Sequence, residues 1–60
     1  MSAKTKLKKA LSAIDDAATA LRRARNYANP DAEIQIRKAL SELDDAEHDI
    51  KRAIREIPDV

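Results

Sequence analysis

Residues 8–24 read KKALSAIDDAATALRRA, and residues 37–53 repeat this segment as RKALSELDDAEHDIKRA, at an offset of 29 residues. Nine of the 17 aligned positions are identical, and four more exchange similar side chains. A short Asn-Pro junction lies between the two copies. Self-similarity of this kind is typical of one helical unit used twice. The repeat therefore predicts two similar helices.

The composition around the repeat also favours helix. The 60-residue chain has no Gly and two Pro, and it is dominated by Ala, Leu, Lys, Arg and Glu, all of which are good helix formers. A chain of this length forms one small domain at most. We therefore expect one all-α domain over residues 1–60, with a first helix at about 3–27, a turn at about 28–30 and a second helix at about 31–57.

The ends of the expected helices carry their own signals. Ser2 or Thr5 suits the N-cap of the first helix, and Asn29 suits that of the second. Pro30 suits a first helical position, and Pro58 disfavours helical conformation in the residue before it. So short a turn makes the helices antiparallel neighbours. The fold class is therefore an antiparallel two-helix hairpin.

Apolar residues recur at alternating spacings of four and three, the a/d pattern of a coiled coil. The d and a positions hold, in order, Leu7, Leu11, Ile14, Ala18 and Leu21 in the first helix, and Ile36, Leu40, Leu43, Ile50, Ile54 and Ile57 in the second. Position g is Ala in all eight heptads: Ala3, Ala10, Ala17, Ala24, Ala32, Ala39, Ala46 and Ala53. Because Ala permits close backbone approach, we expect both g edges to line the seam between the helices.

Charged pairs occupy positions e and f, in the order basic, acidic, basic in each helix. The short turn sets like charges level across the hairpin, as with Asp15 and Asp44. Since like charges across a seam are destabilising, we expect the e edges to face solvent or another molecule. A second copy that slides by one heptad would set Asp15 against Lys8 or Arg22 of its partner. A solvated charged face remains the alternative.

The two repeats differ at four non-conservative positions, and three of these are Ala in the first helix. Ala13, Ala18 and Ala20 correspond to acidic residues in the second helix. The first helix is thus apolar over about half its circumference, and such a helix is usually covered on two sides. We expect self-association as a homodimer in a four-helix bundle, with a tetramer as second choice and an unidentified helical protein as another possible partner. The expected interface is Leu7, Ala10, Leu11, Ala13, Ile14, Ala17, Ala18, Ala20, Leu21, Ala24, Leu40, Leu43, Glu47, Ile50 and Ile54.

Four residues depart from the apolar pattern. Arg25 and Glu47 place charges at position a, where a charge lowers stability and often sets register. For Glu47 we expect either pairing with a basic group of a neighbouring chain or solvation. Tyr27 and Ile34 stand nearly level beside the turn, and we expect them to cap that end of the core.

The sequence contains little that suggests chemistry. It has no Cys, no Gly-rich phosphate loop and one His, His48, at an outward position with Asp45 three residues before it. A di-iron bundle needs two Glu-x-x-His motifs that point inward. We therefore predict a non-enzymatic protein with no catalytic, metal or cofactor site.

Charge and compartment suggest few further partners. The net charge of +1 combines +5 over residues 1–30 with −4 over residues 31–60, which favours compact pairing of the halves. The N-terminus lacks the apolar stretch of a signal peptide, and no apolar run approaches the ~18 residues of a membrane span. A small chain without Cys is more typical of a reducing compartment. We expect a cytoplasmic, soluble protein with no membrane partner.

The alternative function is nucleic-acid binding through basic patches at the two ends of the hairpin. Lysines and arginines there would release counterions on binding phosphates. In size and layout the hairpin resembles small plasmid-encoded RNA-binding hairpins that dimerise into four-helix bundles, and this resemblance of architecture implies a similar dimer. Against it, an acidic belt (Asp15, Asp16, Asp44, Asp45) lies between the patches, and no aromatic residue is placed to stack on bases. The patches comprise Lys4, Lys6, Lys8, Lys9, Arg22, Arg23, Arg25, Arg37 and Lys38.

Overall fold

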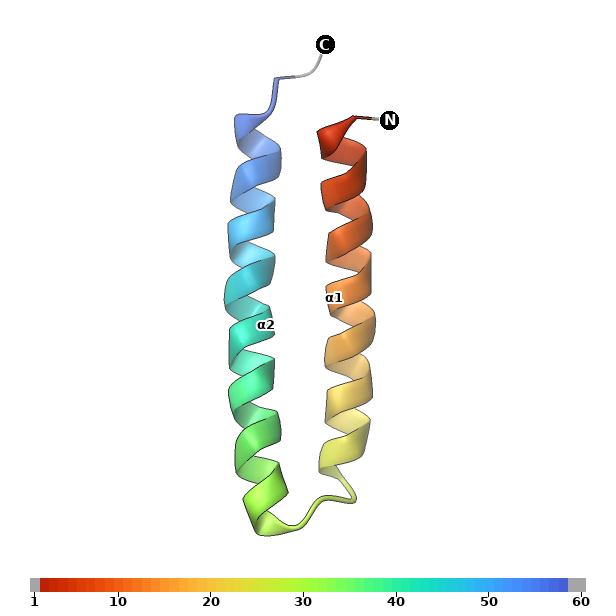
Figure 1. Cartoon of the computed structure of the whole chain (residues 1–60), viewed down its shortest axis with the longest axis vertical. Helices are drawn as coiled ribbons and strands as arrows, with labels where there is room; N and C mark the ends of the chain where they lie inside the picture. The colour runs from red at the N-terminus through yellow and green to blue at the C-terminus, as the bar shows by residue number, and fades with distance from the viewer. Residues whose placement is uncertain (1, 59–60) are drawn as a thin grey trace.

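The structure, a computed structural model, describes residues 2–58. It consists of two helices, α1 (Ala3–Arg25) and α2 (Pro30–Glu56), joined by residues 26–29. They lie side by side and run in opposite directions, so the start of α1 and the end of α2 share one end of the rod (Figure 1). The prediction of an all-helical hairpin is confirmed.

Both helices begin at the predicted capping residues. The Ser2 side chain accepts a hydrogen bond from the Thr5 backbone N–H at 3.1 Å, so Ser2 is the N-cap of α1. The Asn29 Oδ1 accepts from the Ala32 backbone N–H at 2.8 Å, and Pro30 opens α2. These side chains satisfy backbone donors that have no partner within a helix. The local signals in the sequence are sufficient to start each helix.

The first helix ends two residues earlier than expected. The backbone N–H groups of Asn26, Tyr27 and Ala28 donate to carbonyls three residues back, at 3.2, 3.0 and 3.3 Å. This tighter pattern closes α1 as a turn and lets the chain reach the extended backbone that Asn29 needs as a cap. At the other end of the hairpin, α2 stops at Glu56, because Pro58 disfavours helical geometry in Ile57 (φ −89°, ψ 122°).

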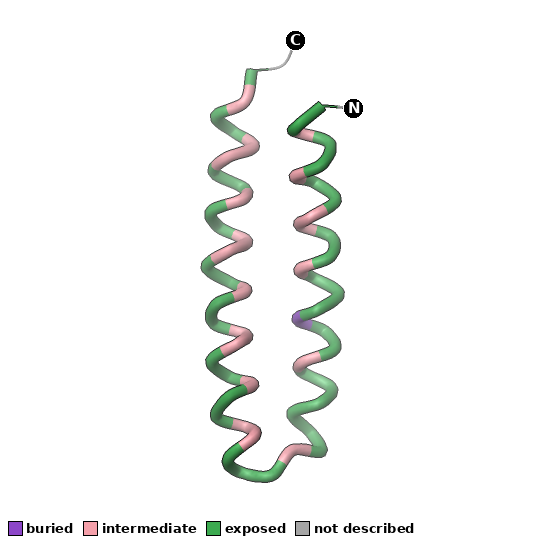
Figure 2. Tube along the Cα trace, in the orientation of Figure 1, coloured by how far each residue is buried: buried purple, intermediate pink, exposed green. Residues whose placement is uncertain are grey.

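The core of the hairpin is open. Among residues 2–58 only Ala18 is buried, with 9% of its surface exposed. Every Leu and Ile at an a or d position is half-buried, and these residues line the facing sides of the helices (Figure 2). Two helices in contact therefore cover each apolar stripe only in part.

The two helices contribute differently to the seam, and one expectation about it is wrong. The g alanines of α2 (Ala32, Ala39, Ala46, Ala53) are all half-buried, but in α1 only Ala10 is, while Ala3, Ala17 and Ala24 are exposed. Apart from Ala10, the seam of α1 therefore consists of apolar residues at its a and d positions. The physical reason is size: the Leu and Ile side chains of α1 fill the space that the small α2 side chains leave, which turns the α1 alanines outward.

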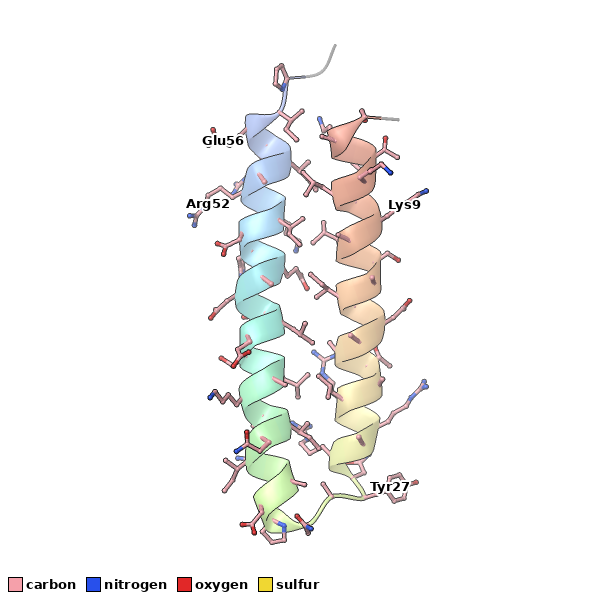
Figure 3. All side chains as sticks on the ribbon, viewed as in Figure 1. Lys9, Tyr27, Arg52 and Glu56 are labelled. Carbon is pink, nitrogen blue, oxygen red and sulfur yellow. The ribbon has the colours of Figure 1, made fainter. Side chains whose placement is uncertain are left out.

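The expected cap at the turn end of the core is also wrong. Tyr27 is 91% exposed and Ile34 is 63% exposed. Figure 3 shows Tyr27 pointing away from α2. Tyr27 lies in the turn after α1 has ended, so the helical register no longer directs it inward. The half-buried residues nearest the turn are instead Ala28 and Ala32.

Neither helix of the described chain combines the length and the apolar character that a membrane crossing requires.

Candidate interaction surface

One face of α1 is apolar and uncovered. It follows spacings of three and four residues, and we call it the alanine face: half-buried Ala10 and the exposed residues Ala13, Ala17, Ala20 and Ala24. The corresponding c positions of α2 are Gln35, Glu42, Asp49 and Glu56, all exposed and polar. The face therefore belongs to α1 alone. Its c alanines stand where the two repeats differ, and most of its g alanines are exposed where those of α2 are half-buried.

The alanine face has an apolar border and a charged border. On the side of the seam lie the half-buried d residues Ile14 and Leu21. On the outer side lie the exposed f residues Lys9, Asp16 and Arg23. Figure 3 shows Lys9 pointing away from α2. An apolar strip with a core edge and a charged edge is the layout of a helix-packing surface.

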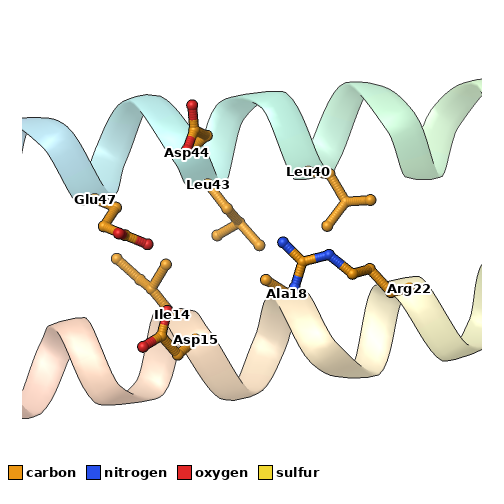
Figure 4. A pocket seen from close by; sticks show the side chains of 8 residues that line it. All are labelled: Ile14, Asp15, Ala18, Arg22, Leu40, Leu43, Asp44 and Glu47. Atoms are coloured by element: carbon orange, nitrogen blue, oxygen red, sulfur yellow. The ribbon is translucent and has the colours of Figure 1, made fainter.

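The opposite flank of the seam is polar. A hollow of about 40 Å³ lies there between the helices, lined by charged side chains of both, among them Asp15 and Arg22 of α1 and Asp44 of α2. Arg22 extends toward α2 (Figure 4). All six e residues are exposed, as expected: Lys8, Asp15, Arg22, Arg37, Asp44 and Lys51. The hollow is far below the ~300 Å³ of a small-ligand site. This flank therefore offers charges and little apolar area.

A wider hollow of about 470 Å³ lies along α2. Its lining residues are His48, Lys51, Ile54 and Arg55, which all belong to that one helix. No lining residue comes from α1, so the hollow is an open surface. An open surface on one helix lacks the enclosure that orients a substrate.

Glu47 breaks the apolar seam but has a partner on its own helix. Its Oε1 lies 2.9 Å from the Lys51 Nζ, and its side chain is 28% exposed. The hydrogen bond and the charge of Lys51 lower the pKa of Glu47, and Glu47 in turn raises the pKa of Lys51. The heptad pattern alone does not indicate this pair; its signal in the sequence is an acidic and a basic residue four positions apart. Pairing of Glu47 with another chain stays a prediction.

Replacing Glu47 by Leu is expected to raise the melting temperature of the helical signal by about 5 °C. In Figure 4 Glu47 extends from α2 toward Ile14, so a Leu there would bury apolar surface, while the ion pair it removes is exposed and contributes little. Without the charge, the assembly should also become less homogeneous by size-exclusion chromatography. Glu42→Leu, at an exposed c position of α2, is the control and should not raise the melting temperature. An unchanged melting point for Glu47→Leu would contradict the prediction.

His48 does not join an acidic cluster. Its Nδ1 lies 2.9 Å from the Asp44 backbone oxygen and 3.8 Å from the Asp44 Oδ2, so the ring approaches Asp44 rather than Asp45. Within residues 2–58, no group of three or more His, Cys, Asp or Glu side chains could hold a metal ion. The arrangement is a solvated side chain on a helix, 66% exposed.

The basic residues fall at the two ends of the rod, as the antiparallel arrangement requires. Lys6, Lys8 and Lys9 lie on the first turns of α1. Arg22, Arg23, Arg25, Arg37 and Lys38 lie toward the turn, where Arg37 pairs with Glu33 at 2.7 Å. The acidic belt occupies the middle of both helices. A phosphate backbone laid along the rod would therefore meet repulsion halfway.

No protein family, curated protein or solved structure matches this chain. Its function is therefore argued from the surfaces above, and among these the alanine face is the apolar one that the hairpin itself leaves uncovered.

Proposed function

We propose that this protein is a non-enzymatic helical hairpin that associates with a second copy of itself and serves as a structural or protein-interaction module. The observation that carries the proposal is the open core: among residues 2–58 Ala18 alone is buried, and apolar residues of α1 remain exposed beside the seam. Two hairpins would form a four-helix bundle. A cytoplasmic location is part of the proposal, supported by the lack of Cys in so small a chain.

The exposed area supports a second copy quantitatively. The hairpin exposes 4805 Å². A compact protein of its mass, 6.7 kDa, exposes about 3900 Å². The excess of about 900 Å² is close to the ~800 Å² that each partner buries in a standard protein interface. Burial of one interface would therefore bring this chain to the exposure of a compact protein.

The alanine face is the surface on which the copies meet in this proposal. Its apolar border continues into Leu7, Ile14 and Leu21, which are half-buried in the hairpin and would be covered further. The other flank of the seam presents the e charges, and burial of unpaired charges opposes association. The apolar flank is thus the favourable one.

The proposal predicts a solution mass of two chains, twice 6.7 kDa, at micromolar concentration in sedimentation equilibrium. The melting temperature should also rise with protein concentration, because association stabilises the folded form by mass action. A fully helical species of one chain, with a melting temperature independent of concentration, would overturn the proposal. A mass of four chains would keep the self-association and replace the dimer by a tetramer.

A further inference from the structure

We infer that the second copy lies antiparallel on the alanine face, in a register that sets Ala17 of one chain level with Ala20 of the partner subunit. This inference rests on the proposed self-association and specifies its geometry. It follows from three observations: the spacing of the alanines, the charges along their outer border, and the exposure of Tyr27.

The spacing makes the alanine face a second helix-packing seam. Positions g and c alternate by three and four residues, as a and d do, so α1 carries two seams that share the d column as a border. In an antiparallel pair of α1 helices, each g residue of one helix lies level with a c residue of the other. Three registers, each one heptad apart, do this with at least two heptads of each α1 helix overlapping: Ala17 lies level with Ala13, with Ala20, or with Lys6 of the partner subunit. Alanine at both layers allows the backbones to approach closely.

The outer charges decide among these registers. If Ala17 lay level with the partner's Ala13, Asp16 would face its own counterpart, and Lys9 would face Arg23. A parallel pair in register would set the charged f border of one helix against the apolar d border of the other, so Asp16 would gain no opposite charge. If Ala17 lies level with the partner's Ala20, Asp16 comes within two residues, or about 3 Å along the axis, of Arg23 of the partner subunit. The two-fold symmetry repeats this pair, so the register forms two attractions between Asp16 of one chain and Arg23 of the other.

Lys6 and Tyr27 decide between the two registers that remain. The register that sets Ala17 against the partner's Lys6 also pairs opposite charges, but it brings a lysine into the alanine seam. The inferred register excludes Lys6 and brings Tyr27, in the turn that follows α1, near the level of Ala10 of the partner subunit. Tyr27 is 91% exposed in the single hairpin and points away from α2 (Figure 3). In the dimer this sole aromatic residue gains a small apolar surface to cover.

Cysteine pairing tests the register directly, because the chain has no Cys of its own. Ala13→Cys and ¹⁵N-labelled Ala24→Cys are mixed in a glutathione redox buffer, and the disulfide-linked species are weighed by mass spectrometry. The inferred register sets these two positions level and predicts the mixed disulfide in excess over both self-pairs. Excess of a mixed Ala10→Cys/Ala20→Cys disulfide would show the register that sets Ala17 level with the partner's Ala13. Dominant self-pairing at every position would show a parallel dimer. Either result overturns the inference.

Charge reversal gives a second, independent readout on the intact fold. Asp16→Arg and Arg23→Asp should each weaken the dimer about tenfold, because each replaces two attractions by two repulsions. The double variant Asp16→Arg/Arg23→Asp should restore the original dissociation constant, which a merely structural role would not do. Failure of this rescue contradicts the register. A monomeric unaltered chain would instead reject the proposed function, whereas a dimer with other disulfides rejects only this inference.

Discussion

Replacing Ala17 and Ala20 together by Glu is expected to leave the hairpin folded but monomeric, at 6.7 kDa, instead of at twice that mass as proposed for the unaltered chain. Both residues are exposed in the single hairpin, and Glu is a good helix former, so the hairpin itself should tolerate the change. In the dimer the two substitutions place four carboxylates in the seam between the α1 helices. Unpaired buried charges cost several kcal/mol each by order of magnitude, more than such an interface can offset. Light scattering coupled to size-exclusion chromatography gives the mass.

The matched control for this variant is Ser12→Glu/Thr19→Glu. It adds the same charge to the same helix, at two b positions that are also exposed but lie on the other flank of the seam. The control should remain dimeric. If the control dissociates while the Ala17/Ala20 variant stays dimeric, the interface lies on the flank that carries the e residues.

Leu43→Asp is expected to abolish the helical fold. Leu43 lies opposite Ile14 and Ala18 at the middle of the seam (Figure 4). The carboxyl side chains of Asp15, Asp44 and Glu47 line the same hollow. The substitution removes a half-buried apolar side chain and adds a fourth carboxylate to this hollow. The combined cost, about 3 kcal/mol or more, is a large fraction of the stability of so small a domain. The measurement is the loss of the helical circular dichroism signal and of the cooperative urea transition.

Ser41→Asp provides the comparison for Leu43→Asp. It introduces the same residue two positions away on α2, at an exposed site. Its effect should be limited to the small loss of helix propensity. A Leu43→Asp chain that melts like the Ser41→Asp chain would show that the seam at Leu43 contributes little to the fold.

The features that the sequence predicts correctly are local or repeated. Ser2, Asn29 and Pro30 each act on their own helix end, so single residues were sufficient to locate the starts of α1 and α2. The a/d spacing was sufficient to identify the seam. Such signals need no knowledge of how two helices meet.

The features that the sequence did not predict depend on the helix rotation and on where the helix stops. Position g is Ala in both helices, so the pattern could not show that α1 turns its alanines outward while α2 turns them in. The burial of Tyr27 was expected from a helix extended to that residue, and it fails because α1 ends at Arg25. The alanine face was anticipated from Ala13 and Ala20, but its extension through Ala17 and Ala24 follows from the rotation.

The antiparallel hairpin brings the start of α1 and the end of α2 to one pole of the rod (Figure 1). In the antiparallel pair inferred above, the two poles point in opposite directions, with the Ala3 positions roughly 45 Å apart along the axis. A domain joined to either terminus would therefore lie at one end of a rigid helical rod, away from the domain joined to the other chain. Such a dimer would act as a spacer that links two attached domains and keeps them apart.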